Sequence, residues 1–150
     1  MQTKLLEEDV LAEARRLILE EDVPCVFVRE GAVLRPGEGT GVRPLVRALD
    51  EEPELLRGSV VVDKIVGKAA AMLAVLGGAA GVYGLTMSAA AWDYLAARGI
   101  PAEWETLTER IINRTGTGLC PMETAVLDID DPAEGLAALR ETMGRLAAGQ

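Results

Sequence analysis

The stretch Ser59-Val-Val-Val-Asp-Lys-Ile-Val-Gly-Lys-Ala-Ala-Ala-Met-Leu-Ala-Val-Leu76 decides the fold of this chain. Its β-branched beginning, Ser59 to Val62, is typical of a strand that is buried on both faces of a parallel sheet. The apolar residues from about Lys64 to Leu76 predict a buried helix. A buried strand that leads directly into a buried helix indicates an α/β domain.

The same alternation continues toward the C-terminus. We expect a strand at 81–87, a helix at 89–98 and a short strand at 102–106. The final helix should begin at Asp131-Pro-Ala-Glu134, because this segment combines a capping Asp, a proline in the first turn and a Glu three residues after the cap.

Toward the N-terminus, helical spacing of apolar residues predicts a helix that ends near Asp22. Two short strands, 25–29 and 32–35, should form a hairpin around Glu30-Gly31. A further helix should begin near Gly41. Residues 1–150 therefore predict a single α/β domain, with a mixed sheet of about five strands and helices on both faces.

The composition excludes several classes of function. The chain has 15 Lys and Arg against 24 Asp and Glu, and its net charge of −9 argues against binding to nucleic acid. The longest apolar run, 69–83, is shorter than the ~20 residues that a membrane span needs. No cleavable signal is visible, so we expect a cytoplasmic protein with two free cysteines. The absence of histidine excludes imidazole chemistry.

Two segments resemble nucleotide-binding motifs but do not match them. Gly67-Lys68 lacks the preceding glycine and the following Ser or Thr of a P-loop. Gly37-x-Gly39-x-Gly41 lacks the spacing of a dinucleotide fingerprint and follows a hairpin. We therefore expect no cofactor.

The junction between the buried strand and its helix is the first candidate binding segment. Asp63 lies at this junction, and Lys64 and Lys68 are four residues apart, so they would share one helix face. Two lysines in apolar sequence favour a nearby anion. In the alternative, Asp63 caps the helix and both lysines reach solvent.

A glycine-containing turn, Gly39-Thr40-Gly41, is the second candidate. Glycine lets the backbone approach a ligand closely, and the free N–H groups at the start of a helix attract anions. In the alternative, the segment is a plain flexible turn.

The third candidate is the loop from Arg110 to Glu123, which contains Asn113 and Arg114. Cys120 precedes Pro121 and lies three residues before Glu123, so it should be the N-cap of a short helix. The positive end of a helix favours the thiolate, whereas the charge of Glu123 opposes it. In the alternative, Cys120 is a half-buried packing residue.

These segments also carry a resemblance. The chain resembles a family of prokaryotic proteins known as a domain of unknown function, which is similar in fold to the cytidine deaminases. The strings that carry the resemblance are Val61-Val-Asp-Lys-Ile-Val-Gly-Lys-Ala-Ala70, Arg110-Ile-Ile-Asn-Arg-Thr-Gly116, Gly118-Leu-Cys-Pro-Met-Glu123 and Leu127-Asp-Ile-Asp-Asp-Pro132.

The resemblance implies a three-layer deaminase-like domain without its zinc. In zinc deaminases, the helix after the hairpin begins with a His- or Cys-containing motif, and the helix after the next strand begins with a paired-cysteine motif. Here those positions are residues 39–43 and 63–67, which contain neither His nor Cys. We therefore expect no metal. Other relatives of this fold, such as a formate dehydrogenase accessory sulfurtransferase, bind nucleotide-like ligands without zinc.

Three functions follow as hypotheses. The preferred one is binding of a small anionic, nucleotide-like ligand, with or without zinc-independent catalysis. Its residues would be Gly39, Thr40, Gly41, Lys64, Lys68, Asn113, Arg114 and Glu123, with Asp63 as a catalytic base. The second is a thiol enzyme or sulfur carrier that uses Cys120. The third is a non-catalytic interaction module, with a homodimer as one form. Exposed apolar surface near Trp92 would favour the third hypothesis.

Overall fold

The computed structural model describes residues 5–35, 39–113 and 115–149 of the chain. The described residues form one five-stranded mixed sheet with the strand order β2-β1-β3-β4-β5. Strands β3, β4 and β5 are parallel, and β1 is antiparallel to both β2 and β3. The strands are β1 (Cys25–Arg29), β2 (Ala32–Leu34), β3 (Val60–Val66), β4 (Gly81–Ser88) and β5 (Ala102–Thr108).

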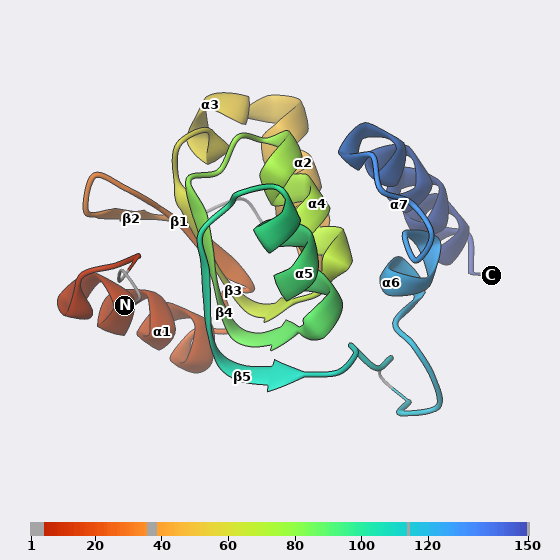
Figure 1. The fold of residues 1–150 in the computed structure, drawn as a ribbon, viewed down its shortest axis with the longest axis horizontal. Helices are drawn as coiled ribbons and strands as arrows, with labels where there is room; N and C mark the ends of the chain where they lie inside the picture. Colours follow the sequence, from red (N-terminus) through yellow and green to blue (C-terminus); the bar gives the residue numbers. More distant parts are fainter. Residues whose placement is uncertain (1–4, 36–38, 114, 150) are drawn as a thin grey trace.

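Helices cover both faces of the sheet (Figure 1). One face packs against α1, and the other packs against α2, α4 and α5, with α6 and α7 outside them. The helices are α1 (Glu8–Glu20), α2 (Arg43–Glu51), α3 (Pro53–Leu56), α4 (Lys68–Leu76), α5 (Ala89–Ala97), α6 (Pro121–Ala125) and α7 (Pro132–Ala147). This arrangement confirms the predicted α/β class and the mixed five-stranded sheet.

Each face has its own apolar core. The core under α1 is small and includes Ile18, Val26 and Val62. The larger core surrounds α4, whose residues from Ala69 to Ala74 are all buried. Because most of these α4 residues are alanine, the helix can pack closely on the sheet and on its neighbouring helices.

The hairpin and the final helix have the local geometry that their sequences predict. Glu30 and Gly31, between β1 and β2, both have a positive φ, at 50° and 80°, which suits the right-handed twist of a hairpin. Asp131 caps α7, and its carboxylate accepts a hydrogen bond of 3.0 Å from the Glu134 N–H.

The boundary between β3 and α4 differs from the prediction. The parallel ladder of β3 with β4 continues through Ile65 and Val66, and Val66 is buried in the larger core. The helix therefore begins at Lys68, and the prediction that Lys64 and Lys68 share a helix face is wrong. The short helix α3, between α2 and β3, was not predicted; its Leu56 is buried in the larger core.

None of the helices in the described part of the chain is both long and apolar enough to cross a bilayer.

Candidate functional site

The candidate segments gather at one edge of the sheet. Strands β3, β4 and β5 are parallel, so their carboxyl ends lie at the same edge, where α/β domains commonly bind ligands. Strand β2 ends at that edge too, because β1 is antiparallel to both β2 and β3. The turn 39–41, Gly67 and the loop after β5 therefore begin at this carboxyl edge.

The start of α4 at this edge is occupied by a side chain of the protein itself. The Glu123 carboxylate accepts a hydrogen bond of 2.8 Å from the Lys68 N–H and one of 3.0 Å from the Ala69 N–H. Glu123 is buried; burial raises its pKa, and the two backbone donors oppose that rise. The position at which we expected an external anion is thus filled by an internal carboxylate.

Lys68 is directed away from such an anion, into contacts with α5 and the loop before α7. Its ammonium group donates a hydrogen bond of 3.2 Å to the Leu127 carbonyl and lies 6.0 Å from the centre of the Tyr94 ring. The Tyr94 hydroxyl donates to the Asp130 carbonyl, and the Arg98 guanidinium contacts the same carbonyl. Lys68 therefore helps to attach residues 127–130 to the helical layer.

Lys64 is exposed on β3, and its backbone N–H donates to the Pro24 carbonyl. It lies on a different element from Lys68, so the structure does not bring the two lysines together as we expected. The third predicted cation, Arg114, lies outside the described residues.

Asp63 is the most unusual ionisable group in β3. It lies in the middle of the strand, three residues before the carboxyl end, and not at the junction with α4 as we expected. It is 5 % exposed and stands opposite Cys25 on β1. Burial raises its pKa from the ordinary 3.8 to about 7, although the backbone N–H groups of Ile65 and Lys64 oppose the rise. Burial, followed by the proximity of Asp63, raises the pKa of the Cys25 thiol well above its usual value. A buried carboxyl group that holds a proton near neutral pH can act as a proton donor or acceptor.

The remaining predicted residues lie in the surrounding loops. Cys120 is the N-cap of α6, as predicted, and it is half-buried and free. Asn113 organises its own loop, since its side-chain oxygen accepts hydrogen bonds from the Thr117 N–H and the Thr115 hydroxyl. Gly39 and Gly41 have positive φ, and Thr40 accepts a hydrogen bond from the Arg43 N–H just before α2.

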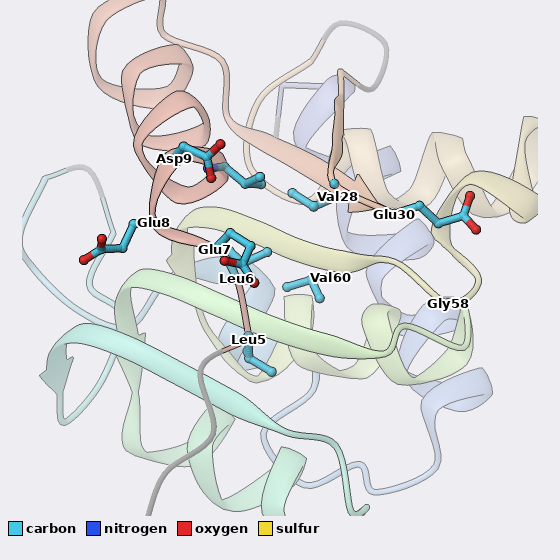
Figure 2. A pocket seen from close by; sticks show the side chains of 11 residues that line it. Leu5, Leu6, Glu7, Glu8, Asp9, Val28, Glu30, Gly58 and Val60 are labelled. Carbon is cyan, nitrogen blue, oxygen red and sulfur yellow. The ribbon is translucent and has the colours of Figure 1, made fainter.

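Two hollows lie away from this edge, around the segment that leads into α1. The larger, of about 720 Å³, has an apolar floor that includes Val28 and Val60 and an acidic border that includes Glu7 and Glu30 (Figure 2). The sequence does not predict this hollow, because its lining comes from three separate segments, 5–10, 28–31 and 58–60.

The second hollow, of about 430 Å³, is the aromatic groove, which is lined by Leu6, Glu8, Leu11, Tyr83, Trp92, Glu103 and Trp104. Trp92 on α5 and Trp104 on β5 meet edge to face, with ring centres 5.9 Å apart. Trp104 is 38 % exposed and Leu107, on the same strand, is 41 % exposed. Both residues lie on an edge strand, so apolar surface is exposed along the side of the sheet.

The described residues contain no group of three or more Cys, Asp or Glu side chains that could hold a metal ion. Residues 13–143 match the family model TM1506, described as a domain of unknown function (DUF1893). The chain belongs to this family.

The fold of the family agrees with the structure. The chain is similar to the crystal structure of a DUF1893 family protein (TM1506) from Thermotoga maritima, with a TM-score of 0.76 and 22% identity. The similarity covers 97% of this chain and 95% of that chain. No curated protein matches the chain. The family description names no activity, so a function for this DUF1893 chain has to be argued from its own residues.

Proposed function

We propose that this DUF1893 chain is an interaction module that binds a protein partner along β5 and the adjoining aromatic groove. The observation that carries the proposal is the exposure of Trp104 and Leu107 on an edge strand of the sheet. Large apolar side chains beside a strand edge that pairs with no other strand in the described residues are typical of a surface that binds another chain.

The backbone of β5 supports this proposal. The Pro101 carbonyl accepts a hydrogen bond from the Val82 N–H, so residue 101 directs its polar groups toward β4. Because successive residues of a strand direct these groups to opposite sides, Trp104 and Thr106 direct theirs outward. Outward donors and acceptors beside apolar side chains suit the addition of an extended strand.

The sequence of β5 has few of the features that usually protect a strand edge. It contains no proline or lysine, and its two acidic side chains are engaged within the chain. Glu103 accepts a hydrogen bond from the Leu5 N–H, and Glu105 forms an ion pair with Arg15. Arg15 therefore balances the charge of Glu105, whereas Glu103 is held by a backbone donor and keeps its negative charge.

Site-specific photo-cross-linking in cells tests this proposal. A photoreactive residue at position 107 should give adducts heavier than the chain, whereas one at Leu19 on α1 should not. Leu19 is a matched control because its side chain is similarly exposed, at 52 %, but lies on another surface. Equal labelling at both positions, or no adduct at position 107, would contradict the proposal.

A second candidate function is binding of a small anionic, nucleotide-like ligand at the carboxyl edge. Asp63, a buried carboxyl group with a pKa of about 7, supports it, as does the gathering of residues 39–41 and 113 at the same edge. The deaminase-like, zinc-independent architecture that the sequence predicts is consistent with a ligand site at this edge. The ligand would have to displace Glu123 from the start of α4 or bind beside it.

Thermal-shift measurements with inorganic phosphate and nucleoside monophosphates test this candidate, because a ligand stabilises the protein that binds it. A rise in melting temperature that is smaller in Lys64→Met would support it. An unchanged melting temperature for every compound would remove it.

The thiol hypothesis depends on Cys120, a half-buried free thiol at the start of α6. It is tested by the alkylation experiment described below. We also propose a cytoplasmic location, which is supported by the two free cysteines.

A further inference from the structure

We propose that the partner of β5 is a second copy of this chain, and that the two β5 strands pair antiparallel about a twofold axis at Glu105. This inference rests on the proposed interaction function and names its partner. The pairing would join two five-stranded sheets into one continuous sheet, with the same surface used by both copies.

The backbone alternation selects the paired residues. Ala102, Trp104, Thr106 and Thr108 direct their N–H and carbonyl groups outward, as argued from the Val82–Pro101 hydrogen bond. If the twofold axis passes through Glu105, all seven residues of β5 pair with residues of the second copy's β5, because Glu105 is the midpoint of the strand. Trp104 then stands opposite Thr106 of the second copy, an aromatic residue against a β-branched one.

The charges favour this register over its neighbours. Moving the axis to residue 104 would place Glu103 opposite Glu105 of the second copy at two positions. Moving it to residue 106 would place Glu103 opposite Glu109 of the second copy, again twice. With the axis at Glu105, Glu103 faces Leu107, and the two Glu105 side chains are the one acidic pair within the overlap.

The structure already neutralises that acidic pair. The Glu105 carboxylate accepts hydrogen bonds of 2.7 and 3.2 Å from the Arg15 guanidinium and one of 2.9 Å from the Tyr83 hydroxyl. Arg15 belongs to α1, on the face of the sheet toward which Glu105 points. Two such carboxylates can therefore approach at the axis without two unbalanced negative charges.

A matched pair of variants at Thr106 tests the backbone pairing. Thr106→Pro removes an outward N–H and leaves the ladder with β4 intact, whereas Thr106→Val keeps the N–H and the β-branched shape. In sedimentation velocity over a concentration series, the natural chain and Thr106→Val should form the same dimer. Thr106→Pro should raise the dimer dissociation constant at least about tenfold, since two hydrogen bonds per dimer are lost. Circular dichroism and thermal unfolding check that each variant folds.

A second pair of variants tests the register. Arg15→Met should weaken the dimer, and more strongly at low salt, because it exposes the two Glu105 charges to each other. Adding Glu105→Gln to Arg15→Met should restore dimerisation, which a merely structural role of Arg15 would not predict. A dimer that is indifferent to Arg15→Met and to Thr106→Pro would overturn the proposal.

The outcomes also separate this inference from the proposed function. A natural chain that stays monomeric at every concentration overturns self-association. If position 107 nevertheless cross-links to a chain of different mass in cells, β5 binds another protein and the interaction function stands. If it cross-links to nothing, both proposals fail.

Discussion

The carboxylate of Glu123 occupies the space that a side chain at Gly67 would need. A β-carbon built at residue 67 would overlap the carboxylate oxygens of Glu123, at distances far below van der Waals contact. Gly67 has an extended backbone with a φ of −101°, so its need for glycine is steric and does not come from an unusual backbone conformation. The pair attaches α6 to the start of α4, although 56 positions separate the two residues in the sequence.

We expect Gly67→Ala to lower the free energy of unfolding by about 1–3 kcal/mol, because the new methyl group must displace the Glu123 carboxylate. Glu123→Ala should lower it by about 1–2 kcal/mol, because the Lys68 and Ala69 N–H groups lose their acceptor. Urea denaturation of both variants and of the natural chain measures these changes.

The double variant decides whether the two residues act on each other. Once Glu123→Ala has removed the carboxylate, the methyl group of Gly67→Ala has room, so the double variant should be more stable than the sum of the single losses implies. Additive losses would show that Gly67 is required for a reason other than Glu123.

Asp63 should make stability fall as the pH rises. Its pKa is about 7 in the folded protein and ordinarily 3.8, so between these values the folded chain holds a proton that the unfolded chain has released. The free energy of unfolding should therefore decrease from about pH 4 to about pH 7, by up to about 4 kcal/mol, and then level off. Asp63→Asn should flatten this slope and stabilise the protein at neutral pH.

Denaturant titrations between pH 4 and pH 8 measure the slope for both chains. Asp93→Asn on α5 is the control, because Asp93 is exposed. A slope that persists unchanged in Asp63→Asn would assign the pH dependence to other carboxyl groups, of which Glu123 is the first to test.

Most of the architecture could be predicted because it depends on local patterns. The β-branched run before Asp63 and the turn at Glu30-Gly31 both indicate their structures from neighbouring residues alone. The end of β3 could not be predicted in this way. Lys64 is compatible with a strand or with a helix, and pairing with β4, which is a tertiary contact, decides between them.

The candidate site was harder to predict because it depends on which distant residues meet. Glu123 was predicted as a ligand-binding residue, but its contact with the Lys68 and Ala69 N–H groups spans more than 50 residues and has no local signature. Trp104 was not predicted as a site residue. Its partial exposure follows from the position of β5 at the edge of the sheet, which the strand order alone determines.

The two cysteines should differ strongly in reactivity. Cys25 is fully buried in β1, and burial together with Asp63 raises the pKa of its thiol well above the usual value. Cys120 is half-buried at the start of α6. Iodoacetamide under native conditions should therefore alkylate Cys120 and leave Cys25 unmodified, as read by peptide mass spectrometry. An unreactive Cys120 across the pH range would eliminate the thiol-enzyme and sulfur-carrier hypotheses.

The two lysines should contribute differently to stability. Lys68→Met loses a hydrogen bond to the Leu127 carbonyl, a contact with the Tyr94 ring and a charge interaction with Glu123, so the free energy of unfolding should fall by about 0.5–1.5 kcal/mol. Lys64→Met changes an exposed residue on β3 and should stay within about 0.5 kcal/mol of the natural chain. Urea denaturation at one pH and salt concentration compares the two. Because both substitutions remove one positive charge from a chain of net charge −9, their general electrostatic effects match and any difference reports local contacts.

Equal losses would show that the contacts of Lys68 do not hold residues 127–130 against the helical layer. A large loss in Lys64→Met alone would give Lys64 a structural role and rule it out as a residue held in place for an anionic ligand.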